Sequence, residues 1–372
     1  MPNKTLFFFI GFLCVFAIAV SAAYMGGLLL PRASVVSPHI VPVSSDLPPI
    51  ISTHTYPFEE GVINITVPVS DSVYQEAKLT AKETTLYGNV SEEIWVTDSY
   101  RSMVNDPAQD EIYRALNREF EKIKTGHGFS DDEYVELMTT FVQSLRYETL
   151  ADNPVKFPVE TVVDGSGDCD DKSLLLAGLL SREGYRVALL SFGPEAHMAV
   201  GTASENYLYK NTNYTFIETT KISYVGTPAE ALTGNLTLQS NPVIIPIGNG
   251  TKVYTSGKET RYINDMYVQS ELKAFGLEPQ IRSLESDLKT RQEKITQLEV
   301  QMQQLKISGN ILDYNAQVSV HNTMVSDYNT LLNTYRGIFG QYERYFQIHN
   351  YILEHEFDRV GVYEYVKKNL PA

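Results

Sequence analysis

The segment VDGSGDCDDKSLLLAGLLSREGYRVALL, residues 163–190, joins a glycine-rich turn to an apolar helical run and then to a strand-like run. Asp168 is a candidate helix N-cap, Cys169 would be the first helical residue, and Asp171 lies where a capping box places its carboxylate. Gly184 follows the apolar run and predicts the end of the helix. The segment therefore predicts a cysteine in the first turn of a helix that enters the core.

A thiol at this position experiences opposing electrostatic effects. Unpaired N–H groups and the helix dipole stabilise a thiolate, whereas the carboxylates of Asp168, Asp170 and Asp171 disfavour it. A dipole contribution of about 1 kcal/mol does not outweigh several nearby carboxylates. An effective nucleophile at Cys169 therefore needs a histidine partner. The alternative is a small buried side chain, which is how most free cysteines behave.

Two strand-like runs downstream supply candidate partners for this thiol. His197 opens the run HMAVGT and shares a strand face with Ala199 and Gly201, so we expect small residues beside the imidazole to leave space for a substrate. Glu218, in the run YTFIETT, is a candidate for the acid that orients the imidazole. Each residue alone also fits a structural role, which for Glu218 would be an exposed edge-strand carboxylate.

The composition of the chain restricts its partners. The 372 residues carry a formal net charge of −15, and without a Lys/Arg cluster this excludes nucleic acid. The two cysteines are Cys14, which lies in an apolar run, and Cys169, so we expect a free thiol rather than a disulfide framework. No spacing of His, Cys, Asp or Glu is typical of a metal site, and neither a metal nor a cofactor is expected.

The N-terminus predicts an attachment to the membrane. Leu6 to Leu30 is apolar, uncharged and long enough to cross a bilayer as a helix, so residues 1–30 are interpreted as a single-pass anchor. The alternative is a cleaved signal peptide, because small residues at Ala19 to Ala23 offer a cleavage point. Residues 31–57 are rich in proline and serine and are interpreted as an extended spacer.

Five N-x-S/T sequons follow the apolar run, and none occurs after Thr251. Their clustering predicts that the main domain is extracellular, at the cell surface. Their asparagines are Asn64, Asn89, Asn213, Asn235 and Asn249.

Residues 58–255 predict a domain of the α+β class. A candidate strand, GVINITVPVS, precedes two amphipathic helices, the first with apolar residues from Ile112 to Ile123 and an end near Gly126. The second helix follows a capping box formed by Ser130 and Glu133. Three strand-like runs then follow the segment at 163–190, and this succession of helices and strands is typical of an α+β fold.

The C-terminal region, residues 260–372, predicts an antiparallel helical hairpin of coiled-coil type. Apolar residues recur at a and d spacing from Ile281 to Leu305, are interrupted by SGN at 308–310, and resume from Ile311. Gly276 and Pro279 predict a break upstream of the first helix, so the aromatic end of the second helix would need another surface. That surface would be the catalytic domain or a second chain.

The stretch FPVETVVDGSGDCDDKSLLLAGLLSREGYRVALL, followed by HMAVG and YTFIETT, closely resembles the transglutaminase-like superfamily, especially its membrane-anchored archaeal and bacterial members. The similarity extends over less than half of the chain, from about Phe141 to Thr220. It implies a papain-like core in which Cys169 is the nucleophile, His197 the base and Glu218 the third member.

The resemblance also implies residues that support the catalytic ones, but it does not extend to calcium activation. Gln143, in FVQSLRY, becomes a candidate for oxyanion support or packing, and Asp168 for support of the nucleophile's helix. Glu218 replaces the aspartate that is usual in animal transglutaminases, although both acids accept an imidazole N–H. No calcium-site pattern is evident, so calcium activation is not carried over.

Two functions follow from these interpretations. The first is acyl transfer or hydrolysis at amide or peptide carbonyls of a protein or peptide substrate, through a thioester on Cys169. The second is a catalytically silent surface scaffold that binds a partner protein or itself through the hairpin. Contact of Cys169 with His197, and of His197 with Glu218, would favour the enzyme, whereas a separated or deeply buried triad would favour the scaffold.

Overall fold

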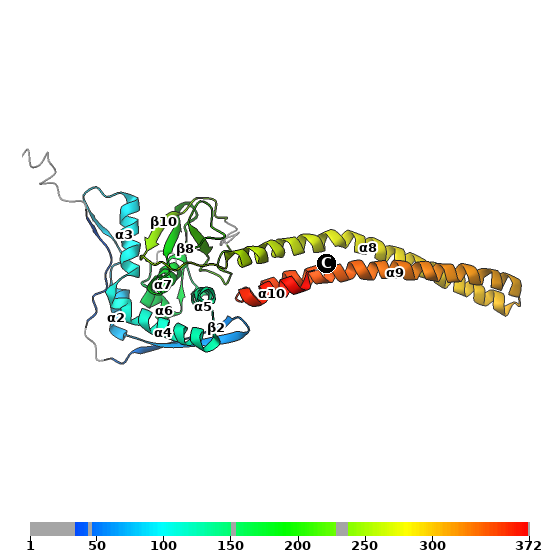
Figure 1. The fold of residues 1–372 in the computed structure, drawn as a ribbon, viewed down its shortest axis with the longest axis horizontal. Coiled ribbons are helices and arrows are strands. Elements are labelled where there is room, and N and C mark those ends of the chain that lie inside the picture. Colours follow the sequence, from blue (N-terminus) through cyan, green and yellow to red (C-terminus); the bar gives the residue numbers. More distant parts are fainter. Residues whose placement is uncertain (1–33, 44–46, 150–153, 228–236, 371–372) are drawn as a thin grey trace, which may run out of the picture.

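The computed structural model describes residues 34–43, 47–149, 154–227 and 237–370. Helix α7 (Cys169–Arg182) packs against an antiparallel four-stranded sheet, and helices and two-stranded sheets surround this unit (Figure 1). The sheet has the order β10-β7-β8-β9. Its strands are β7 (Val187–Phe192), β8 (His197–Ala203), β9 (Tyr214–Ile217) and β10 (Val243–Ile247).

The two faces of this sheet bury different apolar clusters, as side-chain alternation requires. Met198 and Val200 belong to the main core together with the leucines of α7, whereas Ala199 and Phe216 belong to a smaller cluster on the other face. The predicted division of β8 into two faces is therefore confirmed, and so is the α+β class.

The predicted helical half of the domain is present. Helix α4 (Asp110–His127) ends at Gly128, whose φ of 74° is left-handed, and α5 (Asp131–Ser144) begins with the predicted Ser130–Glu133 capping box. The remaining elements of this part, outside the four-stranded sheet, include one further helix of 13 residues, α3 (Glu92–Val104), and several shorter elements. The shorter ones are β1 (Ser34–Val36), α2 (Asp71–Leu79), β4 (Thr85–Tyr87), η1 (Pro107–Gln109), β5 (Arg146–Tyr147), α6 (Pro158–Asp164), β6 (Ser166–Gly167) and η2 (Gly193–Glu195).

The extended spacer predicted for residues 31–57 is wrong at its C-terminal end, from Ile50 onward. Strand β2 (Ile50–Phe58) pairs in antiparallel register with β3 (Gly61–Val69) and buries Tyr56 and Phe58 in the main core. Thr53, Thr55 and Pro57, which suggested a spacer, alternate with these aromatics, as expected for a two-stranded ribbon with one exposed face. This ribbon covers α4 and α5, so the domain begins before residue 58 (Figure 1).

Three helices form the C-terminal region. They are α8 (Gly257–Ile307), α9 (Ile311–Glu354) and α10 (Arg359–Asn369), and the predicted turn at 308–310 is confirmed (Figure 1). The predicted break at Gly276 and Pro279 is wrong, because α8 passes through both residues. A proline removes only one N–H donor from this long helix, and the exposed backbone there remains accessible to water.

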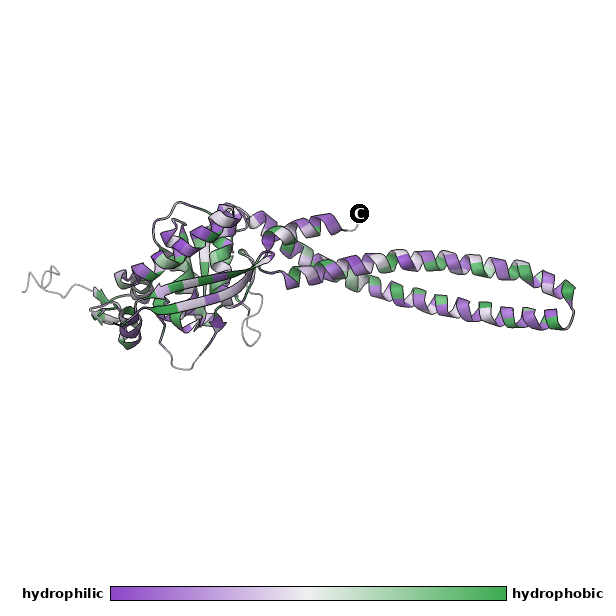
Figure 2. Ribbon diagram, turned by 90° about the horizontal axis from the view of Figure 1, so that it is seen from below, coloured by the Kyte–Doolittle hydropathy of each residue, from purple (hydrophilic) through white to green (hydrophobic). Residues whose placement is uncertain are grey.

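This longer α8 supplies the surface for the aromatic end of α9. Tyr267 of α8 stacks on His349 of α9 with 4.5 Å between ring centroids, and Ile352 packs in the same cluster as Ile263. Further out, the Tyr335 hydroxyl donates to Glu285 at 3.0 Å. Figure 2 shows apolar residues recurring at intervals along both arms, as the a and d pattern predicts.

The predicted anchor at residues 1–30 lies outside the described residues. Among the helices that the structure describes, none combines the length and apolarity required to span a bilayer. Asn64, Asn89, Asn213 and Asn249 are all exposed, and Asn235 lies outside the described ranges.

Candidate active site

The start of α7 is built as predicted. Asp168 Oδ1 accepts hydrogen bonds from the N–H groups of Asp170 (3.0 Å) and Asp171 (3.2 Å), and Asp171 Oδ2 accepts from the N–H of Asp168 at 3.1 Å. Gly167 is required here, because a Cβ would lie 2.6 Å from Asp171 Cβ. The carboxylate of Asp168 therefore caps the helix that carries Cys169.

His197 and Glu218 are in contact, as predicted. The imidazole Nε2 lies 3.1 Å from Glu218 Oε2. Oε1 of Glu218 accepts hydrogen bonds from the N–H groups of Thr219 (3.0 Å) and Thr220 (2.9 Å) and from the Thr220 hydroxyl (2.7 Å). Burial acts to raise the pKa of Glu218, but the bonds to His197 and Thr220 outweigh it and hold that pKa below its ordinary value. Glu218 is fully buried, so the exposed edge-strand interpretation does not apply.

Cys169 lies beside this pair without a hydrogen bond to it. Its Sγ is 4.0 Å from the carbonyl oxygen of Ala196, the residue before His197, and 3.5 Å from Asp170 Oδ1. Within the part of the chain that the structure describes, no hydrogen bond joins Sγ to the imidazole. Burial above all, and then the charge of Asp170, raise the pKa of the thiol, whereas the N–H of Met198 lowers it.

Asp170 also contacts a residue that the sequence reasoning missed. The hydroxyl of Tyr100, on α3, donates to Asp170 Oδ2 at 2.7 Å. Burial raises the pKa of Asp170, and the bond from Tyr100 opposes this effect. No local pattern in the sequence links these residues, because α3 reaches α7 only through the tertiary fold. The structure thus gives Asp170, which capping does not explain, two partners.

Gln143 does not serve as an oxyanion donor, and this alternative of the prediction is wrong. Its Nε2 donates to the carbonyls of Glu218 (2.7 Å) and Ser223 (3.0 Å), and its Oε1 accepts from the N–H of Ser223 at 3.3 Å. Both amide hydrogens are therefore committed to backbone acceptors. The packing alternative is the one that fits, since Gln143 holds the chain that follows Glu218.

Lys172 is a second residue that the sequence reasoning missed. Its side chain is fully buried, and Nζ donates to the carbonyls of Gln143 (3.0 Å) and Leu145 (2.8 Å) at the C-terminal end of α5. Burial lowers the pKa of Lys172 to about 8, and the charge of Glu218 opposes that change. The sequence feature that could have revealed Lys172 is a lysine next to the apolar run of α7. It joins the nucleophile's helix to the helix of Gln143.

The expected substrate space beside His197 is filled. A Cβ at Gly201 would meet Tyr214 Cβ at 2.8 Å, and the ring centroid of Phe192 lies 6.4 Å from that of His197. The small residues of β8 therefore make room for aromatic rings. Tyr147 is 37% exposed, and burial together with the charges of Cys169 and Asp168 raises its pKa to about 12.

The site combines a free thiol at a helix start with an imidazole held by a buried carboxylate. In the described ranges, no group of three or more His, Cys, Asp or Glu side chains is arranged to hold a metal ion. The geometry offers a nucleophile, a base and an orienting acid. No protein-family model, curated protein or solved structure matches this chain.

Proposed function

We propose that the protein is a membrane-anchored, extracellular cysteine enzyme of transglutaminase-like type with a papain-like core. It would act on the amide or peptide carbonyls of a protein or peptide. The observation that carries the proposal is the buried His197–Glu218 pair, at 3.1 Å, next to a thiol at the first residue of α7. The four exposed sequon asparagines are consistent with an extracellular domain.

The reaction starts with transfer of the Cys169 proton to His197. Because Nε2 contacts Glu218, Nδ1 is the nitrogen that accepts this proton. Rotation about the Cα–Cβ bond of Cys169 would carry Sγ from Asp170 toward the imidazole, and hydrogen bonds in unliganded sites commonly tighten only when substrate binds. The acidic surroundings of the thiol make this imidazole essential.

The thiolate then attacks the carbonyl carbon, and the carbonyl π electrons move to oxygen. The N–H of Cys169 precedes the first intrahelical hydrogen bond, from Lys172 N to Asp168 O at 3.1 Å, so the helix offers it no acceptor and it can face this oxyanion. Collapse of the intermediate breaks the C–N bond, and His197 gives its proton to the departing amine. The resulting thioester is resolved by water or by a second amine.

Thiol labelling tests this proposal in the full-length chain carrying Cys14→Ser, so that Cys169 is the remaining cysteine. Iodoacetamide should modify Cys169, Cys169→Ala should abolish modification, and His197→Asn should slow it by at least about tenfold. The site of modification is read by peptide mass spectrometry. A rate in the His197→Asn variant equal to that of the parent would contradict the proposal. Resolution of a peptide thioester by glycine ethyl ester or by water then distinguishes transfer from hydrolysis.

The second candidate is a catalytically silent surface scaffold acting through its hairpin on a partner protein or on another copy of the chain. The observations that favour it are the 8% exposure of Cys169 and the direction of its S–H toward Asp170. A folded chain whose Cys169 stays unmodified until denaturant is added would support the scaffold over the enzyme.

A further inference from the structure

The base of the hairpin contacts the chain that follows Glu218. We call residues 218–225 the acid segment, because it begins with the carboxylate that holds His197. It follows directly on β9 and has no regular secondary structure of its own. The position of Glu218 therefore depends on what holds this segment.

Both long helices of the hairpin, α8 and α9, form hydrogen bonds with the acid segment. Thr260, in the first turn of α8, is fully buried and donates from Oγ1 to the carbonyl of Val225 at 2.9 Å. The hydroxyl of Tyr224 donates to the carbonyls of Ile352 (3.2 Å) and His355 (3.0 Å) at the end of α9. The hairpin thus contacts the acid segment from both of its long helices.

Helix α5 holds the other end of the acid segment. Gln143 Nε2 donates to the carbonyls of Glu218 (2.7 Å) and Ser223, and its Oε1 accepts from the N–H of Ser223. These bonds are buried, so breaking one would leave an unpaired polar group away from water. The segment is therefore fixed between α5 and the hairpin rather than by one of them alone.

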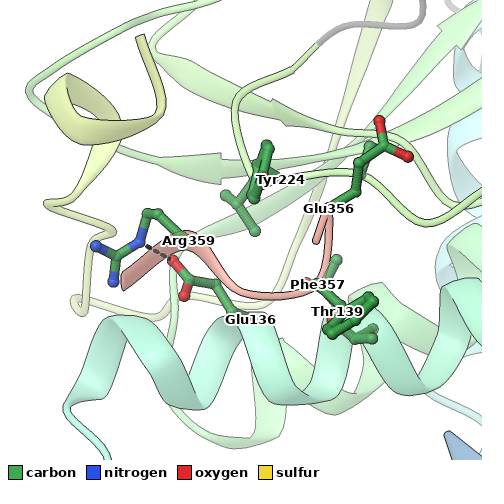
Figure 3. Close-up of a pocket in the computed structure, with 9 residues that line it drawn as sticks. Glu136, Thr139, Tyr224, Glu356, Phe357 and Arg359 are labelled. Carbon is green, nitrogen blue, oxygen red and sulfur yellow. Dashed lines mark hydrogen bonds and ion pairs between the residues drawn. The ribbon is translucent and has the colours of Figure 1, made fainter. Parts of the chain in front are cut away.

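The hairpin and α5 are themselves joined by a buried ion pair. Arg359, at the start of α10, donates from Nε to Glu136 Oε1 at 2.6 Å, and the Tyr254 hydroxyl donates to the same oxygen at 2.5 Å. Figure 3 shows Arg359 and Glu136 in contact, with Tyr224, Glu356 and Phe357 beside them. The space among these residues is a cavity of only about 10 Å³, so the junction is closely packed.

We propose that the base of the hairpin positions the catalytic site. Thr260 of α8, and Tyr224 of the acid segment through its bonds to the end of α9, are the positioning residues that hold Glu218 against His197. This inference rests on the proposed function, since it assigns the hairpin a role in the same triad. The hairpin then has a role in catalysis as well as in binding. Displacement of its base would release the acid segment and weaken the His197–Glu218 contact.

The experiment uses the full-length chain with Cys14→Ser and compares Thr260→Val and Tyr224→Phe with Glu218→Gln. Both variants keep the shape of the side chain and remove a hydroxyl donor. Thr296→Val is the matched control, because Thr296 also lies on α8 but its hydroxyl donates to Gln292 O of its own helix, at 3.0 Å. Two quantities are measured in each variant. The first is the rate of Cys169 modification by iodoacetamide across pH 5 to 9, and the second is the rate of hydrogen exchange in the acid segment.

We expect Thr260→Val and Tyr224→Phe to slow modification by about fivefold, the effect of losing one buried hydrogen bond. Their pH profiles should shift in the same direction as that of Glu218→Gln, and the N–H groups of Thr219 and Thr220 should exchange faster. Thr260→Ser should restore the parent behaviour, and Thr296→Val should match the parent. A purely structural role would lower stability without moving the pH profile.

Parent-like pH profiles and exchange in both variants, alongside a shifted Glu218→Gln, would overturn this inference and leave the proposed function intact. An unshifted Glu218→Gln profile would overturn both. If Cys169 is unreactive in every variant, the proposed function fails, and unchanged exchange at Thr219 and Thr220 would then also overturn the positioning of the acid segment.

Discussion

Asp170 places a negative charge directly beside the candidate nucleophile. Its Oδ1 lies 3.5 Å from Cys169 Sγ, and its charge is one of the causes that raise the pKa of the thiol. Asp170→Asn removes the charge but keeps an acceptor for the S–H. A fall of one unit in the thiol pKa would increase the thiolate fraction, and therefore iodoacetamide labelling at pH 7, about tenfold.

The control for this substitution is Asp98→Asn, which removes an exposed carboxylate from α3. Labelling of Cys169 should then proceed at the parent rate. Equal labelling in Asp170→Asn would show that the carboxylate does not suppress the thiol, and slower labelling would show that it assists it. The sequence predicted the cap formed by Asp168, because a cap depends on neighbouring residues. It did not predict the contact between Tyr100 and Asp170, because that contact joins separate helices.

Helix α7 approaches α4 so closely that one position tolerates only glycine. A Cβ at Gly178 would lie 2.0 Å from Tyr113 Oη, and Tyr113 is fully buried. Gly178→Ala should therefore lower the free energy of unfolding by about 1–3 kcal/mol, the usual effect of overpacking a core. Urea unfolding followed by circular dichroism measures this change.

Gly337, in the middle of α9, provides the matched substitution. A Cβ there meets no atom within 4 Å, so Gly337→Ala should raise stability by up to about 1 kcal/mol through helix propensity alone. Opposite signs for the two Gly→Ala substitutions are expected. A loss of stability at Gly337 similar to that at Gly178 would contradict the packing explanation.

Local patterns in the sequence predicted several elements and failed where tertiary contacts decide. The capping boxes at Ser130 and Asp168 and the turn at 308–310 depend on neighbouring residues, and all three are confirmed. Strand β10 was missed, and β2 was mistaken for spacer, because pairing with a distant partner is what makes them strands. Gly276 and Pro279 were mistaken for a break upstream of the first helix, because a long helix tolerates the loss of one N–H donor where its backbone is exposed to water.

The Arg359–Glu136 pair connects the helical hairpin to the globular part. Arg359→Leu would leave Glu136 buried without its cation, which typically costs about 3–5 kcal/mol. The double variant Arg359→Leu/Glu136→Leu should recover most of that loss, because both buried charges are then absent. Chemical denaturation of the two variants and the parent tests this coupling, and additive losses in the double variant would refute it.

Glu59 gives the attachment of the hairpin a dependence on pH. Its N–H donates to Phe357 O at 3.3 Å, and burial, together with a hydrogen bond and charge from Glu133, raises the pKa of Glu59 to about 8. The folded chain keeps a proton that the unfolded chain releases near pH 4.5. This contribution to stability is therefore complete below about pH 4.5 and is lost as pH rises through 8.

Glu59→Gln should remove that dependence while keeping the size of the side chain. The difference in unfolding free energy between pH 5 and pH 8 should be smaller in Glu59→Gln than in the parent. Denaturant titrations of both proteins at the two pH values provide the measurement. An equal difference in the two proteins would assign the pH dependence to other groups.

The antiparallel course of the hairpin makes its reach adjustable. Helix α8 has 51 residues and is about 77 Å long, and α3 lies on the far side of the globular part from the tip (Figure 1). Removing one heptad from each arm would draw the tip in by about 10 Å and keep the a and d contacts in register. The base, with Thr260 and Arg359, would be unaffected. The reach of the tip can therefore change in evolution without any change in the residues around Cys169.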